Sequence, residues 1–169
     1  MHPIEKPIIV LFGQPASGKS TLAKELTRIF NSDWCNVHVI DGDSVRSIFS
    51  NSDYSREGRI RNLNRISDIA KYMSHQVDVV IVAAVYPYEE ARRYLSAMHP
   101  HVTWVHLTFD GQRGREGYFA KDFEEPVGKF MKLNTSKYAI TDCAEKIRAF
   151  HREVSDPTRG PQVPFQKED

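Results

Sequence analysis

The chain has 169 residues, of which 40% are hydrophobic and 27% charged, as expected of a soluble globular domain large enough to bury a core. Its 23 basic and 22 acidic residues give a formal net charge of +1, which argues against nucleic acid or an anionic membrane as a partner. The two cysteines, Cys35 and Cys143, are too few for a disulfide framework, and we see no secretory pattern and no apolar run of roughly 18 residues, so we expect a cytoplasmic protein without a membrane span.

The first two predicted elements enclose a phosphate-binding motif. The apolar run 7–12 predicts a buried strand, and the apolar spacing of residues 21–30 predicts an amphipathic helix. Between them, Gly13-Gln-Pro-Ala-Ser-Gly18-Lys19-Ser20 fits G-x-x-x-x-G-K-[ST], whose glycines let successive backbone N–H groups face a phosphate at a helix N-terminus. We expect Lys19 to reach the β- and γ-phosphates of ATP and the Ser20 hydroxyl to bind Mg²⁺. The predicted ATP-binding residues are Gly13, Ala16, Ser17, Gly18, Lys19, Ser20 and Thr21.

Strands and helices alternate along the rest of the chain. Further strands are predicted at 36–40, 77–85, 102–109 and, more weakly, 130–133. Further helices are predicted at 44–49, 55–75, 89–98 and 141–154. This order is typical of the α/β class, an open parallel β-sheet of about five strands with helices on both faces. We expect one domain over residues 1–154 and a polar, proline-containing tail over residues 155–169.

An acidic pair, Asp41 and Asp43, follows the second predicted strand. Ligands of open parallel sheets bind outside the carboxyl ends of the strands, so this pair belongs to the same rim as the phosphate loop. We expect Asp41 to hold Mg²⁺ together with Ser20, and Asp43 to orient an acceptor hydroxyl. With Lys19, these are the predicted catalytic residues. An ordinary Asp-Gly turn remains the alternative.

A basic track follows the acidic pair. Arg46 comes first, and Arg59, Asn62 and Arg65 recur every three residues on the helix 55–75, close to one line. Guanidinium groups suit a bidentate grip on phosphate or sulfate oxygens. Arg61 is out of line and is expected to be a surface charge. A wholly solvated helix face would explain the track as well.

Several motifs, taken together in their order along the chain, resemble those of one protein family. They are the phosphate loop, Asp41-Gly-Asp-Ser-Val-Arg46, Tyr54-Ser-Arg-Glu-Gly-Arg59 with Asn62 and Arg65, and Pro87-Tyr88. Together, over about residues 8–147, they resemble adenylylsulfate kinases. The resemblance implies a P-loop NTPase fold like that of nucleotide and shikimate kinases. It also implies Mg²⁺-dependent transfer of the γ-phosphoryl group of ATP to the ribose 3′-hydroxyl of adenosine 5′-phosphosulfate, in sulfate assimilation. The residues that it assigns to the acceptor are Asp43, Arg46, Arg59, Asn62, Tyr86 and Pro87.

The chain departs from the family pattern around the acceptor. Tyr86 stands where the family has a serine, and we expect its ring to narrow the acceptor pocket or to stack on a different base. The family's Gly-Phe-Thr-Gly-Ile segment is absent, and Tyr118 and Phe123 are candidate aromatic substitutes or simply lid packing. A lid over residues 112–132 is expected to add an arginine or lysine and to exclude water.

Two alternatives to adenylylsulfate kinase stay open at this stage. One is a kinase that acts on another small nucleotide-linked anion, such as a cytidine diphosphate derivative. The other is a non-catalytic nucleotide-binding sensor module, against which the acidic pair and the basic track argue. The sequence leaves the oligomeric state open, a homodimer included.

Overall fold

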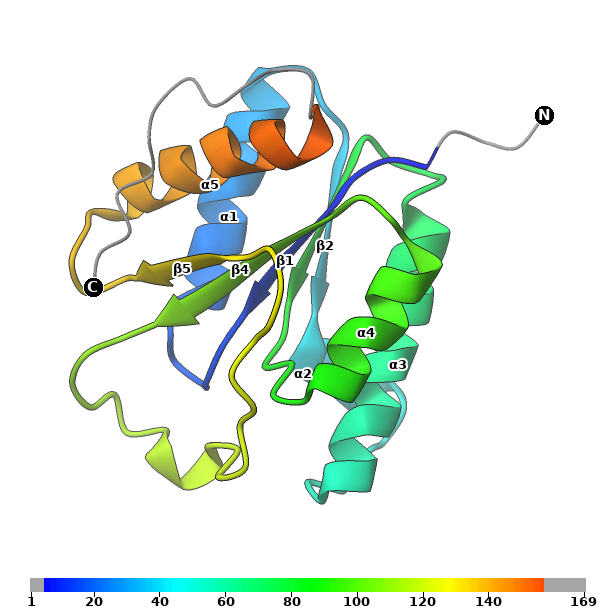
Figure 1. Ribbon diagram of the computed structural model, residues 1–169, viewed down its shortest axis with the longest axis vertical. Coiled ribbons are helices and arrows are strands. Elements are labelled where there is room, and N and C mark those ends of the chain that lie inside the picture. Colours follow the sequence, from blue (N-terminus) through cyan, green and yellow to red (C-terminus); the bar gives the residue numbers. More distant parts are fainter. Residues whose placement is uncertain (1–4, 157–169) are drawn as a thin grey trace.

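A five-stranded parallel sheet forms the centre of the protein in the computed structural model, which describes residues 5–156 (Figure 1). The strands are β1 (Ile8–Phe12), β2 (Val37–Asp41), β3 (Val79–Ala83), β4 (Val102–Thr108) and β5 (Met131–Asn134). Their order across the sheet is β2-β3-β1-β4-β5, and every neighbouring pair is parallel. The predicted fold class is therefore confirmed.

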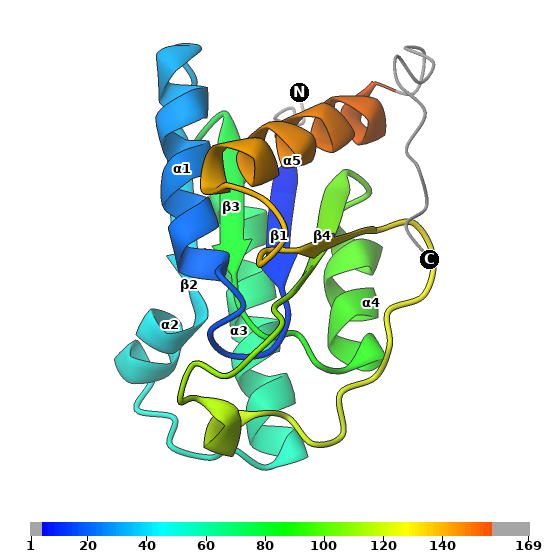
Figure 2. The same ribbon diagram turned by 90° about the vertical axis from the view of Figure 1, so that its left-hand side faces the viewer.

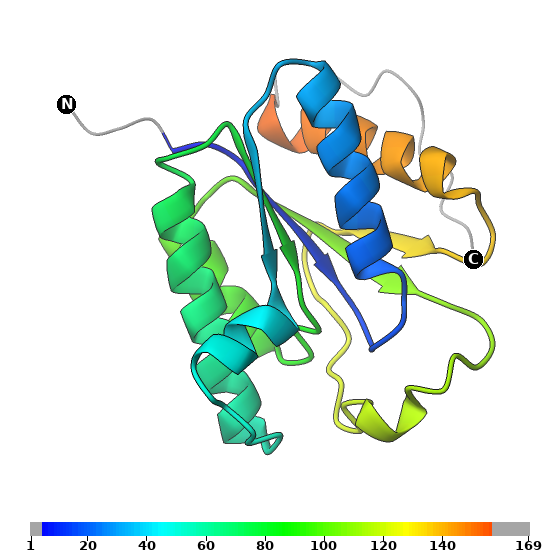
Figure 3. The same ribbon diagram turned by 180° about the vertical axis from the view of Figure 1, so that it is seen from behind.

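Helices cover both faces of this sheet. They are α1 (Lys19–Ser32), α2 (Gly42–Ile48), α3 (Arg56–Met73), α4 (Glu89–Met98) and α5 (Ile140–Ser155), with a short 3₁₀ turn, η1 (Glu116–Tyr118). Helices α1 and α5 lie on one face, and α3 and α4 lie on the other (Figures 1 and 3). Side chains alternate across β1, so that Ile9 and Leu11 pack with α1 and α5, whereas Ile8 and Val10 pack with α3 and α4. A central strand covered on both faces explains why the run is apolar throughout.

The element boundaries differ from the predicted ones by at most two residues. Helix α1 begins at Lys19, two residues earlier than predicted, because Gly18 adopts a left-handed conformation that starts the helix there. Helix α3 begins after Ser55, which is its N-cap, because the Ser55 Oγ accepts a hydrogen bond from the backbone N–H of Gly58. Ser155, assigned above to the tail, is the last residue of α5. Residues 157–169 of the predicted tail lie outside the described residues.

The topology gathers the loops that matter at one rim of the sheet. Because all five strands are parallel, the loop after β1, helix α2 after β2 and the turn after β3 emerge at the same edge. Figure 2 shows the loop after β1, α2 and η1 together at that end of the molecule. Within residues 5–156, the helices are all too short or too polar to cross a membrane.

Candidate active site

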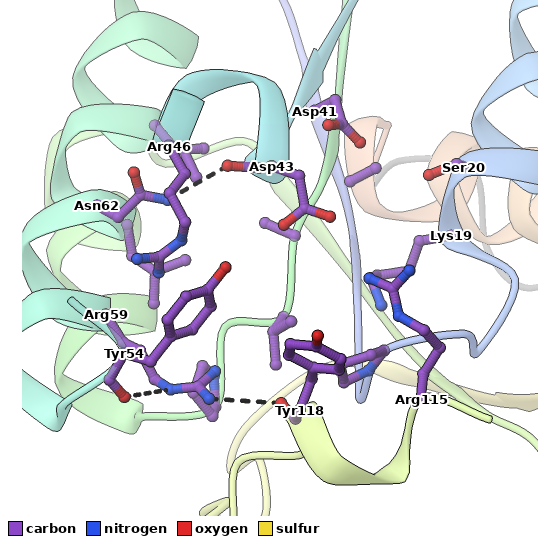
Figure 4. A pocket seen from close by; sticks show the side chains of 18 of the residues that line it. Lys19, Ser20, Asp41, Asp43, Arg46, Tyr54, Arg59, Asn62, Arg115 and Tyr118 are labelled. Atoms are coloured by element: carbon purple, nitrogen blue, oxygen red, sulfur yellow. Dashed lines mark hydrogen bonds between the residues drawn. The ribbon is translucent and has the colours of Figure 1, made fainter. Parts of the chain in front are cut away.

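A cavity of about 920 Å³ opens at the carboxyl edge of the sheet. One wall, here called the loop side, comes from the β1–α1 loop and the first turn of α1. The opposite wall, here called the arginine side, comes from α2, the chain that follows it, and α3. Residues before and within η1 close the cavity from a third direction. Figure 4 shows the two sides facing each other, with Asp43 between them.

The backbone of the loop side has the strained conformations that its sequence motif requires. Gly13 has a φ of +143° and Gly18 a φ of +96°. A Cβ atom at Gly13 would lie 2.2 Å from the carbonyl oxygen of Leu107, so glycine is the residue that fits there. Of the predicted ATP-binding residues, Ala16, Gly18, Lys19, Ser20 and Thr21 line the cavity, whereas Gly13 and Ser17 are buried behind it.

Lys19 is held against its own loop. Its Nζ donates hydrogen bonds to the carbonyl oxygens of Gly13 (3.0 Å) and Gln14 (2.7 Å). Burial lowers the pKa of Lys19 to about 8, although the carboxylates of Asp43 and Asp41 act in the opposite direction. The neutral and the charged forms of Lys19 are therefore both populated near this pKa. A bound phosphate would favour the charged form.

This pKa predicts that nucleotide binding takes up a proton near pH 8. Phosphate oxygens would raise the pKa of Lys19 from about 8, so up to about half a proton should be bound with each ATP at pH 8. For the same reason the affinity for ATP should fall as the pH rises above 8. Calorimetric titrations in two buffers of different ionisation enthalpy measure the proton uptake. Equal binding enthalpies in the two buffers would contradict the prediction, and Lys19→Met provides the control without the titrating group.

Asp41 and Asp43 occupy the rim between the two sides. Asp41 is the N-cap of α2, where its Oδ1 accepts hydrogen bonds from the backbone N–H (2.9 Å) and the hydroxyl (3.0 Å) of Ser44. Asp43 lines the cavity and is exposed, and its carboxylate makes no hydrogen bond or ion pair with any of residues 5–156. The turn alternative thus explains Asp41 in part but leaves the Asp43 carboxylate unused. Gly42 packs against Ala84, which a Cβ atom would approach to 3.0 Å.

The oxygen donors at this rim fit a hard divalent cation. The Ser20 hydroxyl is exposed in the first turn of α1, and the carboxylates of Asp41 and Asp43 point toward it and Lys19 across the cavity (Figure 4). Hydroxyl and carboxylate oxygens are the ligands that Mg²⁺ takes, usually with waters and substrate phosphates completing its shell. The residues present therefore fit the predicted metal.

The arginine side contains three of the four residues of the predicted track. Arg46, Arg59 and Asn62 line the cavity, and the Oδ1 atom of Asn62 is buried without a hydrogen-bond partner among the described residues. Arg65 does not line it, because its guanidinium lies over the ring of Phe49, 4.5 Å from the ring centroid. The binding roles of Arg46, Arg59 and Asn62 stay predictions.

Arg61 is the surface charge that the helical spacing predicts. Its side chain is exposed, and its Nη2 donates to the Asp53 carboxylate at 2.9 Å.

Tyr86 corrects one expectation. Its ring is fully buried rather than in the acceptor pocket, and its hydroxyl lies 2.9 Å from the Ser67 Oγ. The ring also packs edge-to-face on Trp104, with the centroids 5.4 Å apart. A φ of +43° at Tyr86 breaks the extended course of the chain after β3. Because the ring lies in the core, Tyr86 does not narrow the cavity, whereas its neighbour Pro87 does line it.

Two tyrosines face the cavity: sequence reasoning missed Tyr54 as a lining residue, whereas it offered Tyr118 as a candidate aromatic substitute. Tyr54 lies under the guanidinium of Arg46, which is 4.4 Å from its ring centroid. Tyr118 of η1 lies on the third side of the cavity (Figure 4). Arg59 joins them, because its Nε donates to the Tyr54 carbonyl at 3.0 Å and its Nη2 to the Tyr118 carbonyl at 3.4 Å. Tyr54 had been quoted only as part of a motif.

Two arginines match the basic side chain expected in the lid. Arg113 and Arg115 both line the cavity, and Arg113 Nη1 donates to the Ala16 carbonyl of the phosphate loop at 3.1 Å. The lid is also fastened to the loop by Gln14, at a position where the sequence motif accepts any residue. Its amide donates to the Ala120 carbonyl (2.9 Å) and accepts from the Ala120 N–H (3.0 Å).

One cavity is thus surrounded by the phosphate loop, the acidic pair, the arginine side and a lid that carries two arginines. This combination defines a P-loop kinase. The chain belongs to the adenylylsulphate kinase family, whose model matches residues 5–118.

Individual relatives agree with this membership. The chain is 38% identical over 173 residues to an adenylyl-sulfate kinase of Bacillus licheniformis, with 90% of this chain and 86% of that protein covered. It is 41% identical over 91 residues to a probable adenylyl-sulfate kinase of Aeropyrum pernix, covering 53% of this chain and 50% of the relative. It thus spans only a quarter to a half of the length of some curated relatives that it matches. A structure of the Mycobacterium tuberculosis APS kinase CysC in complex with AMPPNP and APS has the same fold, with a TM-score of 0.78, 20% identity, and coverage of 89% of this chain and 99% of that one.

Proposed function

We propose that the protein transfers the γ-phosphoryl group of ATP to the ribose 3′-hydroxyl of adenylyl sulfate. The observation that carries this proposal is one cavity with basic side chains on two opposite walls and the Asp43 carboxylate between them. A phosphate loop alone would serve a nucleotide sensor, but a second cationic wall has a use only if a second anion binds. The names of the relatives supply the identity of that anion.

The residues divide the work as phosphoryl transfer requires. Lys19 and the loop amides hold the β- and γ-phosphates, while Arg113 and Arg115 add positive charge and close the cavity. Ser20 and Asp41 would hold Mg²⁺, which neutralises phosphate charge when bound. Asp43 orients the acceptor hydroxyl by accepting its hydrogen bond, and it can take up its proton. Arg46, Arg59 and Asn62 bind the phosphosulfate and ribose of the acceptor. Positioning and charge neutralisation then carry most of the catalysis.

The correction at Tyr86 favours adenylyl sulfate over the other acceptor. The expectation of an altered pocket had rested partly on a ring at this position, and that ring is buried in the core. Tyr54 and Tyr118 instead offer two exposed rings at the cavity, on which a purine can stack. Phosphorylation of a cytidine diphosphate derivative is the alternative outcome of the test described next.

Transfer of radiolabel from γ-labelled ATP tests the proposal. Wild-type protein with Mg²⁺ is incubated with adenylyl sulfate, with adenosine monophosphate, or with cytidine diphosphate derivatives, and labelled products are separated by chromatography. We expect label in the adenylyl sulfate product and far less in the others. Label in a cytidine product alone would assign the acceptor differently, and release of phosphate without any labelled acceptor would refute the kinase.

We also propose that the acceptor is a small molecule and that the protein is cytoplasmic. The near-zero net charge argues against a nucleic-acid partner. Membership of the family supports a role of the protein in sulfate assimilation. The homodimer stays a prediction, and light scattering of the purified protein measures it.

Arg59 provides a test of the arginine side. Arg59→Ala should raise the KM for adenylyl sulfate about 10- to 100-fold and leave the KM for ATP within about twofold, since one charge-assisted hydrogen bond to an anion is worth roughly 1.5–3 kcal/mol. Steady-state kinetics with each substrate varied in turn measure both constants. Arg61→Ala is the matched control, because Arg61 lies on the same helix and pairs with Asp53 outside the cavity. Equal kinetics in the two variants would leave the track as a solvated helix face.

A further inference from the structure

Residues 119–125, here called the strap, connect η1 to the chain that leads into β5 and pass the first turn of α4 (Figure 2). The strap begins at the cavity, because Tyr118 lines it. On the loop side it is fastened by the Gln14 amide, which makes two hydrogen bonds with Ala120. A second fastening lies at its other end, outside the cavity.

Glu124 makes this second fastening with both its side chain and its backbone. Its carboxylate accepts a hydrogen bond from the backbone N–H of Glu89, the first residue of α4, at 2.7 Å, and pairs with Arg56 Nη1 at 2.9 Å. Its backbone N–H donates to the Pro87 carbonyl at 2.8 Å, and its carbonyl accepts from Arg92 Nη2 at 2.9 Å. The hydrogen bond from Glu89 N–H, with Arg56 nearby, lowers the pKa of Glu124, so the group is a carboxylate at neutral pH.

Three separate elements meet at this one residue. Arg56 begins α3, Glu89 begins α4, and Pro87 belongs to the turn after β3. Two of these elements reach the cavity, because Pro87 lines it and Arg59, which also lines it, lies one turn after Arg56 on α3. Tyr118, the residue before the strap, also lines the cavity, and its carbonyl accepts a hydrogen bond from Arg59 at 3.4 Å.

We propose that Glu124 is a positioning residue that fixes the distance between α3, the turn after β3 and the strap, and thereby sets the affinity of the arginine side for the acceptor. Glu124 does not line the cavity and acts through Arg56 and Pro87. The affinity part rests on the proposed function. The loop side also has contacts that do not involve the strap, such as the hydrogen bonds from Lys19 Nζ to the Gly13 and Gln14 carbonyls, so the affinity for ATP should depend little on Glu124.

The next residue offers a matched control. The Glu125 carboxylate makes no hydrogen bond or ion pair among residues 5–156, and it differs from Glu124 by one position in the same strap. Glu124→Ala and Glu125→Ala remove the same atoms from the same segment. Glu124→Gln keeps an oxygen that can accept from Glu89 N–H but removes the charge that pairs with Arg56.

Calorimetric titrations of each variant with adenylyl sulfate and with ATP give the decisive comparison. Glu124→Ala should weaken adenylyl sulfate binding about tenfold and leave ATP binding within about twofold, Glu124→Gln should lose less, and Glu125→Ala should match wild type. Arg56→Gln should weaken acceptor binding at least as much as Glu124→Gln does, because Arg56 also lies 3.8 Å from the Asp122 carboxylate and over the Tyr88 ring. Combining the two should lose less than the sum of the single losses, because both remove the contact between Arg56 and Glu124. An equal loss for both ligands, additive effects, or a Glu124→Ala variant that binds adenylyl sulfate like wild type would overturn the proposal.

Hydrogen exchange separates this proposal from the proposed function. In Glu124→Ala the amides of residues 119–125 should exchange at least about fivefold faster, while those of α1 and β1 stay unchanged. If wild type binds no adenylyl sulfate, the proposed function fails, and exchange alone then decides whether Glu124 fixes the strap. Unchanged exchange in the strap overturns the positioning role whatever the binding data show. If Glu124→Ala fails to fold, Arg56→Gln opens the same contact from α3, where the arginine is 39% exposed.

Discussion

Lys19→Ala should reduce phosphoryl transfer at least about a thousandfold while the protein remains folded. Lys19 is the one side-chain cation of the phosphate loop itself, and the transition state concentrates charge on the oxygens that it would contact. Removing one preorganised donor from such a site costs about 10²–10³ in kcat, and here a full charge is lost as well. Single-turnover transfer from labelled ATP to adenylyl sulfate measures the loss.

The stability of the Lys19→Ala protein should change little, for a reason visible in the structure. The hydrogen bonds of Lys19 end on the loop carbonyls of Gly13 and Gln14, and burial already disfavours its charge, as its pKa of about 8 indicates. Lys24→Ala is the matched control, because Lys24 is an exposed lysine on the same helix. Thermal unfolding of both variants within a few degrees of wild type would show that the lost activity is chemical. Turnover near that of wild type in a folded Lys19→Ala protein would falsify the kinase proposal.

The parts of the site that could be predicted from the sequence are those whose neighbours in space are also neighbours in the chain. The phosphate loop is a contiguous motif between a strand and a helix, so its position at the cavity follows from local rules. Asp41 and Asp43 follow a strand directly, and in a parallel sheet that alone places them at the rim. The fold class follows equally from the alternation of strands and helices, because that order leaves few other arrangements.

The residues that were misplaced or missed depend on contacts far apart in sequence. Tyr86 turns into the core because Ser67 and Trp104 offer a hydroxyl and a ring at the right place, and neither residue stands out in the sequence. Gln14 meets Ala120 across 106 positions, at a point of the motif where any residue is allowed. Arg65 has the helical spacing of Arg59 and Asn62, but its guanidinium packs on the ring of Phe49 and does not line the cavity. Periodicity gives the face of a helix, and the neighbouring elements decide which part of that face reaches a ligand.

Asp43→Asn should lower kcat for transfer to adenylyl sulfate about 10²- to 10⁴-fold, the usual contribution of a positioned general base. The substitution keeps the size of the side chain and its ability to accept a hydrogen bond, but removes the charge that orients the acceptor hydroxyl and takes its proton. The Asp43 carboxylate has no hydrogen-bond or ion-pair partner among the described residues, so the change breaks no hydrogen bond or ion pair of the described fold. The KM for ATP should stay within about threefold, because Lys19 and the loop amides still hold the donor.

A matched control separates this chemical role from the effect of a charge at a helix N-terminus. Asp43 lies in the first turn of α2, where a negative charge is worth about 0.3–1 kcal/mol to the helix, and Asp142 is an exposed aspartate in the first turn of α5. Asp43→Asn and Asp142→Asn should therefore lower the unfolding temperature by similar small amounts, whereas only the first should lose activity. Asp41→Asn adds a second comparison, since an asparagine still caps α2 and only the proposed Mg²⁺ contact weakens; its loss should shrink as the Mg²⁺ concentration is raised. The loss in Asp43→Asn should persist at any Mg²⁺ concentration, because a general base is not replaced by metal. Full activity in Asp43→Asn would reduce the pair to an Asp-Gly turn that happens to stand beside a nucleotide site.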